Sequence, residues 1–122
     1  MYRLSISRDF IAQHHLIGGD WGAENQVHSH HYRVDLLIEG HQLDEHGYLI
    51  DIVDLERILA EILANFRDRV LNDLSEFRGL NPSVERFARI LWDKLTQRLQ
   101  LQDKSLSLQL WENDSDWAGY AG

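Results

Sequence analysis

The chain has 122 residues, of which 43% are hydrophobic and 26% charged, and its formal net charge is −8. These values are typical of a single globular domain, residues 1–122, and argue against disorder and against a nucleic-acid-binding surface. No segment is apolar for long enough to suggest a membrane span or a signal peptide. The absence of cysteine excludes disulfides and thiolate chemistry, and we expect a cytoplasmic protein.

Two strands are predicted near the start of the chain. Residues 2–7 alternate between apolar and polar side chains, and the pattern resumes at 10–14 after a candidate bulge at 7–9. A glycine-rich loop covers 17–26, and the second strand covers 28–39. Successive side chains of a strand point to opposite faces, so each strand has one face to bury.

Three histidines lie on the apolar faces of these strands. His14 shares a face with Phe10 and Ala12, while His28 and His30 share a face with the apolar residues of the second strand. This placement predicts a metal site with three protein ligands and one open position, the arrangement of catalytic zinc. Zinc is the expected ion, although imidazole also binds iron, nickel and copper. The alternative is that these are structural histidines with hydrogen-bond partners in the core.

Two helices are predicted in the middle of the chain, after a turn at 40–47. Asp51 is a candidate cap for the first helix, whose apolar stripe continues at helical spacing to Phe66. The second helix is marked by Asn81 as its cap and by Pro82 in its first turn.

Strand alternation returns at 104–112, and a short last strand includes Trp117 and Tyr120. The order of elements is therefore ββααββ. This order predicts an α+β domain, a four-stranded antiparallel sheet with both helices on one face. The other face of the sheet would be exposed, and trimers or larger rings of the same chain could cover it.

Two glutamates are candidates to complete a site around the histidines. Glu24 lies in the loop four residues before His28, where its carboxylate could act as a general base beside the metal. Glu112 ends the buried row of the third strand and could accept two N–H donors from the edge of a guanidine-like ring. The alternatives are a solvated loop glutamate for Glu24 and a strand-end glutamate that reaches solvent for Glu112.

The His-x-His pair at 28–30 also fits a cupin, in which Asp35 would stand near the position of the acidic ligand. Cupins are nearly all-β barrels, whereas two helical segments take up much of this chain. The sequence therefore favours the α+β domain.

Six short motifs occur in a fixed order along nearly the whole chain. They are Phe10-Ile11-Ala12-Gln13-His14, His28-Ser29-His30-His31-Tyr32, Gly47-Tyr48-Leu49-Ile50-Asp51, Leu71-Asn72-Asp73, Asn81-Pro82-Ser83-Val84-Glu85 and Leu110-Trp111-Glu112. Together they resemble the signature of the 6-pyruvoyl-tetrahydropterin synthase and 6-carboxy-tetrahydropterin synthase family.

The resemblance implies a tunnelling fold, in which trimeric β-barrels stack into hexamers with active sites at subunit interfaces. It implies zinc on His14, His28 and His30 and a pterin ring held by Glu112. It also implies lyase chemistry on the side chain of dihydroneopterin triphosphate, which in bacteria usually yields 6-carboxy-tetrahydropterin on the route to queuosine.

The chain departs from the family pattern at three places. Glu24 stands where the family has a catalytic cysteine, Arg67 and Asp68 stand where it has an Asp-His pair, and Ser29 replaces a glycine. A branch of the family carries glutamate at the first of these places and is associated with forming 6-hydroxymethyl-dihydropterin for folate synthesis. Glu24 is therefore the expected base, and Asp68 is the candidate to replace part of the Asp-His pair.

Two functions are consistent with this pattern. The first is a zinc-dependent lyase acting on dihydroneopterin triphosphate or a close relative. The second is a non-catalytic, zinc-containing module that binds a pterin or purine and has lost the catalytic groups. Product formation separates them.

Overall fold

The computed structural model describes residues 1–122 and contains one four-stranded antiparallel sheet. In spatial order its strands are β1 (Tyr2–His14), β2 (His28–Gly40), β3 (Ser105–Trp111) and β4 (Trp117–Ala121). Because neighbours in the sheet are antiparallel, the end of β1 lies beside the start of β2. The predicted four-stranded antiparallel sheet is confirmed.

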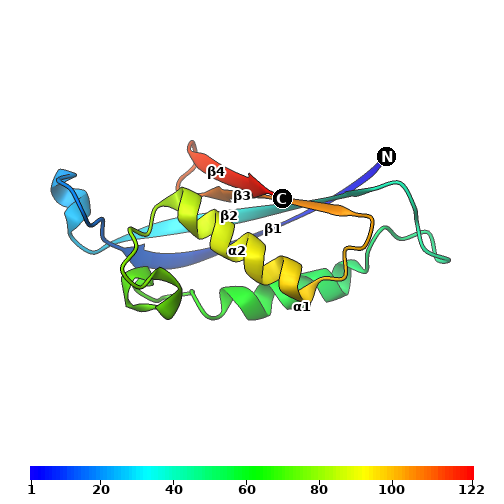
Figure 1. The fold of residues 1–122 in the computed structure, drawn as a ribbon, viewed down its shortest axis with the longest axis horizontal. Helices are drawn as coiled ribbons and strands as arrows, with labels where there is room; N and C mark the ends of the chain where they lie inside the picture. The colour runs from blue at the N-terminus through cyan, green and yellow to red at the C-terminus, as the bar shows by residue number, and fades with distance from the viewer.

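Two helices lie between β2 and β3 in the chain, α1 (Ile52–Leu63) and α2 (Val84–Arg98), and both cover the same face of the sheet (Figure 1). Three short 3-10 turns complete the structure: η1 (Gly22–Asn25), η2 (Leu71–Asp73) and η3 (Ser75–Phe77). Neither helix is long and apolar enough to cross a lipid bilayer. The predicted order ββααββ, with both helices on one face, is confirmed.

The first strand is continuous, and the candidate bulge at 7–9 is wrong. Arg8 pairs in unbroken register with Val34, so it keeps its place on the helix-facing side of β1. Arg8 is a charged residue among apolar ones on this face. Its long side chain reaches outward, and its guanidinium pairs with the carboxylate of Glu56 on α1 at 3.1 Å. The alternation of side chains between the two faces of the sheet therefore continues unchanged from Ile6 to His14.

The helix starts are fixed by side-chain caps. The carboxylate of Asp51 accepts hydrogen bonds from the backbone N–H groups of Val53 and Asp54 in the first turn of α1, as predicted. At α2 the predicted cap is wrong, because Ser83 accepts from the N–H of Arg86, at 3.2 Å. Asn81 instead accepts from the N–H of Ile17 at 2.9 Å, and so joins the start of α2 to the loop that follows β1.

The core lies between the sheet and the helices, and its aromatic part lies beneath the histidines. Phe10 stacks on Tyr32 with ring centroids 5.3 Å apart, and Phe87 of α2 meets both rings edge-on. All three are at most 2% exposed. The ring of His30 lies 5.6 Å from that of Tyr32, so this histidine packs against the buried aromatic cluster.

No element of the chain covers the other face of the sheet, which is mostly polar. Asp35 accepts a hydrogen bond from Nε1 of Trp111 at 2.8 Å, and Arg33 lies over the same indole ring. Arg3 pairs with Glu39 further along the same face. The exposed face predicted from the strand patterns is therefore present in the single chain.

Candidate metal and ligand site

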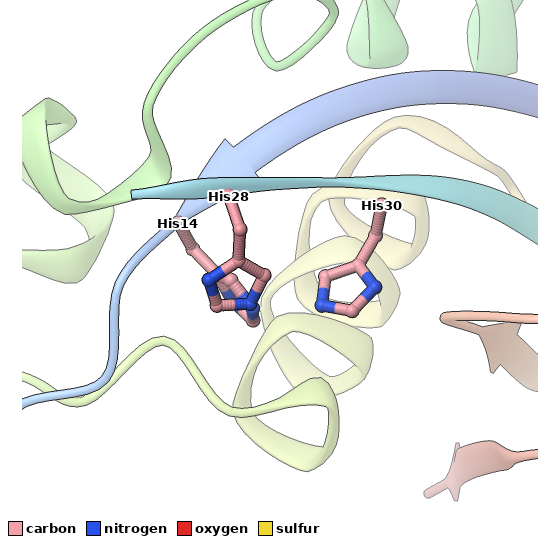
Figure 2. A group of neighbouring side chains, drawn as sticks. All are labelled: His14, His28 and His30. Carbon is pink, nitrogen blue, oxygen red and sulfur yellow. The ribbon is translucent and has the colours of Figure 1, made fainter. Parts of the chain in front are cut away.

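The three histidines converge at one end of the sheet (Figure 2). His14 ends β1 and pairs in register with His28, and His30 follows two residues later on the same face of β2. The ring centroids are 4.6 to 4.9 Å apart, and one nitrogen from each ring lies within 4.8 Å of the others. Strand alternation and antiparallel pairing are sufficient to bring these side chains together.

The hydrogen bonds of two rings determine which nitrogen faces the centre of the cluster. Nδ1 of His14 lies 2.9 Å from the carbonyl oxygen of Pro82, and Nδ1 of His28 lies 2.8 Å from that of Gln26. A carbonyl oxygen only accepts, so each Nδ1 carries the proton and donates it. In the neutral rings, Nε2 is therefore the atom with the free lone pair.

These two Nε2 atoms face each other at 3.0 Å. Two lone pairs repel at this distance, and either a metal ion or a shared proton between them would relieve the repulsion. On a tetrahedral zinc ion with Zn–N bonds of 2.0–2.1 Å, ligand nitrogens are separated by about 3.3 Å. The third imidazole, from His30, supplies the additional ligand that a metal ion needs and a shared proton does not. The three residues therefore fit a zinc ion.

Burial keeps the central histidine neutral. His14 is 3% exposed, and desolvation lowers its pKa from 6.5 to about 4, with a smaller contribution from the neighbouring imidazoles of His30 and His28. The hydrogen bond to Pro82 acts in the opposite direction but does not restore the ordinary value. A neutral imidazole at physiological pH is the form that binds a metal ion.

A cavity of about 230 Å³ opens beside the histidines. Its lining combines imidazoles with carboxylates, a large aromatic ring and small polar groups, namely His14, His30, Glu24, Glu85, Glu112, Trp21, Leu16, Asn81, Ser83 and Val84. The carboxylates come from the loop after β1, the first turn of α2 and the residue after β3. The cavity is thus a place where a ligand could meet the histidines and the glutamates together.

The environment of Glu112 differs from that of an ordinary surface glutamate. Burial raises the pKa of its carboxyl group, and the nearby carboxylates of Glu24 and Glu85 raise it further, while His30 acts to lower it. Its backbone N–H donates to the carbonyl of Asp116 at 3.2 Å, which fixes the chain just beyond β3. Glu112 is therefore half-buried and aimed into the cavity, as its phase with the leucines of β3 suggested.

The comparisons with known proteins agree with this geometry. A sequence model described as 6-pyruvoyl tetrahydropterin synthase matches residues 3–122. The chain belongs to this family. The 6-carboxy-5,6,7,8-tetrahydropterin synthase of Bacillus subtilis is 26% identical over 121 residues, which cover 93% of this chain and 81% of that protein.

Two solved structures of the family have the same fold. The Caenorhabditis elegans 6-pyruvoyl tetrahydropterin synthase superposes with a TM-score of 0.85 at 20% identity, over 100% of this chain and 97% of that chain. A Plasmodium vivax 6-pyruvoyltetrahydropterin synthase, in which alanine replaces a catalytic glutamate, gives a TM-score of 0.78 at 14% identity, over 99% and 97% of the two chains. The tunnelling fold implied by the sequence motifs is thus confirmed.

The loop between β1 and β2 has an ordered structure that positions Glu24. The N–H of Leu16 donates to the carbonyl of Glu24 at 2.9 Å. The side chain of Asn25 donates to Leu16 and to Gly19, and accepts from the N–H of Trp21. Together with the bond between Asn81 and the residue after Leu16, these contacts close the loop into a compact unit beside the cavity.

The other predicted catalytic residue, Asp68, does not line this cavity. Its backbone has a positive φ of 60°, and its N–H donates to the carbonyl of Ile11 at 2.7 Å, which places it along the outer edge of β1. Its side chain is exposed. Within one chain the structure brings together Glu24, Glu112 and the histidines, but not Asp68.

Two lining residues received no role from the sequence alone. Glu85 belongs to one of the six motifs and lies in the first turn of α2. A glutamate there is commonly explained by its interaction with the helix dipole, so the sequence offers no reason to place it in the cavity. Trp21 lies in an irregular loop, where periodicity gives no information about direction. His31, out of phase with His30, points to the opposite face and pairs with Asp9 at 3.0 Å.

Proposed function

We propose that this member of the family is a zinc-dependent lyase acting on the side chain of dihydroneopterin triphosphate or a close relative. One observation carries the proposal. The Nε2 atoms of His14 and His28 face each other beside the ring of His30, and the Nδ1 atom of each of the first two rings is bonded to a backbone carbonyl. This cluster lies at the wall of a cavity that is also lined by three glutamates.

His14, His28 and His30 would hold the zinc ion through three ring nitrogens. Bound there, zinc supplies Lewis acidity, which lowers the pKa of hydroxyl groups on the ligand. The chain's own contribution is to keep His14 neutral and both Nδ1 atoms engaged.

Glu24 is the proposed general base. It lines the cavity with His14 and His30, and the ordered loop holds it in place. A carboxylate in this position can accept a proton from a side-chain hydroxyl of the substrate, which is the first step of a retro-aldol cleavage. The Plasmodium vivax enzyme described above also has a glutamate among its catalytic residues. The product expected from such a cleavage is 6-hydroxymethyl-dihydropterin, as in folate synthesis, whereas the queuosine route would give 6-carboxy-tetrahydropterin.

Glu112 is proposed to hold the pterin ring. The edge of the ring presents adjacent N–H donors, and a carboxylate accepts two such donors side by side. Glu85 lines the same cavity from α2 and offers a second acceptor. A ring held between these glutamates would leave its side chain directed towards Glu24 and the histidines.

We propose that the protein assembles into a trimer or hexamer. One sheet face is polar and uncovered. The outer edge of β4 has no strand partner within the chain, and that of β1 is paired only at its end, where residues 68–70 bond to Ile11 and Gln13. Unpaired edges and an uncovered face are both relieved by closing several sheets into a barrel. Because Asp68 lies at the edge of β1, any catalytic role for it would be at a site shared with a neighbouring copy.

A second candidate is a non-catalytic module that binds a pterin or purine. It is favoured by one observation, that Arg67 and Asp68 replace the Asp-His pair of the family pattern. Both candidates use the same cavity and the same metal ligands. They differ only in whether the ligand is changed.

The experiment that separates them is a product assay. Zinc-loaded protein is mixed with dihydroneopterin triphosphate, and products are identified by mass spectrometry. We expect a product with a shortened side chain, and its loss in Glu24→Gln but not in Glu45→Gln, which removes a similar charge from the exposed turn at 41–47. The absence of turnover in the zinc-loaded protein would leave only the binding module.

A further inference from the structure

Asn72 binds the backbone directly beside His14. It belongs to the Leu-Asn-Asp motif, but it does not line the cavity. Its side-chain amide makes two hydrogen bonds with the main chain of His15: Oδ1 accepts from the N–H, and Nδ2 donates to the carbonyl oxygen, both at 2.9 Å. The amide therefore holds both backbone groups of the residue that follows a proposed metal ligand.

His15 lies just beyond the part of β1 that the sheet holds. The register between β1 and β2 ends with the pair of His14 and His28. The ends of strands are where backbone order is ordinarily lost first, because fewer hydrogen bonds hold them. A metal ligand at the last position of a strand therefore depends on what holds the residue after it.

The segment 68–72 runs along the outer edge of β1 and supplies this support. Its backbone is bonded to that of Ile11 at 2.7 Å and to that of Gln13 at 2.9 Å. The backbone then turns away in η2, and the side chain of Asn72 continues the series at His15. The three supported positions of β1 are two residues apart, which is the spacing of backbone groups that face one edge of a strand.

The direction of Asn72 is set by the core and not by a loose loop. Leu71, which precedes it in η2, is fully buried, so packing fixes the turn that presents the amide to His15. The ring of His14 is oriented separately, by the carbonyl of Pro82. His14 is thus held in two ways, at its ring by Pro82 and at its backbone by Asn72.

We propose that Asn72 is a positioning residue for the metal site. By holding the backbone of His15, it keeps His14 where its Nε2 can share an ion with His28 and His30. This inference rests on the proposed function, since it assumes that the three histidines hold zinc. Removing a residue that holds a metal ligand in place typically weakens metal binding about tenfold or more.

The test measures zinc affinity, by competition with a chromophoric chelator, and the unfolding free energy in urea for the same variants. Asn72→Ala should bind zinc about tenfold more weakly than the wild type. Asp51→Ala is the matched control, because Asp51 also holds two backbone N–H groups, but at the start of α1, at the opposite end of the molecule from the histidines (Figure 1). It should lose a comparable amount of unfolding free energy and bind zinc as the wild type does.

Two results would overturn the inference and leave the proposed function intact. One is wild-type zinc affinity in Asn72→Ala, and the other is an equal loss of zinc affinity in Asp51→Ala, since Asn72 would then serve only the stability of the fold. If the wild type itself binds no zinc, the inference and the proposed function both fail.

Hydrogen exchange on the unaltered protein tests the same inference if Asn72→Ala does not fold. The N–H of His15, whose acceptor is the side chain of Asn72, should exchange slowly in the metal-free protein. Zinc should slow it further, because a coupling between two sites acts equally in both directions. Exchange as fast as in an unstructured chain, or a rate that zinc leaves unchanged, would refute the role of Asn72.

Discussion

Lowering the pH should destabilise the metal-free protein through a single histidine. The pKa of His14 is about 4 in the folded chain, below its ordinary value of 6.5, mainly because the ring is desolvated. Below pH 6.5 the unfolded chain therefore binds a proton that the folded chain does not. By linkage, the unfolding free energy must fall as the pH falls through this range, and it is unaffected by His14 above it.

The size of the effect follows from the two pKa values. The gap between 6.5 and about 4 corresponds to about 3 kcal/mol of unfolding free energy, lost progressively between these two pH values. Small domains have total stabilities of about 5–15 kcal/mol, so the loss is readily measured. It concerns only the metal-free state, because zinc would hold the ring in its neutral form.

The assay is urea unfolding of the chelator-treated protein at a series of pH values from 7 to 4, alongside His14→Asn. Groups away from the cluster titrate alike in both proteins, so the difference between them reports on His14 together with the two imidazoles that it contacts. We expect the stability advantage of the wild type over the variant to shrink by about 3 kcal/mol across this range. A variant at an exposed turn residue, His46→Asn, serves as the control. An advantage that stays constant from pH 7 to pH 4 would refute the argument that burial keeps His14 neutral.

Three further predictions follow from the site and its supports. Asn81→Ala removes the acceptor for the N–H of Ile17, so we expect the unfolding free energy to fall by about 1 kcal/mol. We also expect a reduced kcat at unchanged zinc content, and an unchanged kcat would contradict the role of Asn81 in holding the loop of Glu24. Ser83→Ala removes the cap of α2 and should cost about 1 kcal/mol in urea unfolding, and no loss would argue against Ser83 as the cap. Glu112→Gln should weaken neopterin binding about tenfold by calorimetry while zinc content stays the same, and loss of zinc instead would assign Glu112 to the metal.

The fold could be predicted because its pattern is regular. Even-numbered residues of β1 and β2 face the helices without interruption, and this two-residue period alone placed the three histidines together. The bulge was predicted wrongly because Arg8 interrupts an apolar row. A long side chain can occupy an inward position at the sheet margin and still reach a carboxylate on a helix, and periodicity does not show this.

The site was only partly predictable, for a different reason. Glu112 continues the phase of a strand, so its direction followed from the sequence. Glu85 and Trp21 enter the cavity from a helix start and from a loop, where direction depends on tertiary contacts. Asn81 and Ser83 are both good capping residues. Only the structure shows that Asn81 accepts the N–H of Ile17, and that Ser83 therefore caps α2.

The main-chain partners of His14 and His28 have an evolutionary consequence. A substitution can delete a side-chain hydrogen-bond partner, but no substitution deletes the carbonyl of Pro82 or of Gln26. Substitutions in the surrounding side chains therefore do not remove the hydrogen bonds that orient these two imidazoles. Reactive groups around the histidines, such as the residue at position 24, can then change in evolution while the orientation of the metal-binding imidazoles is kept.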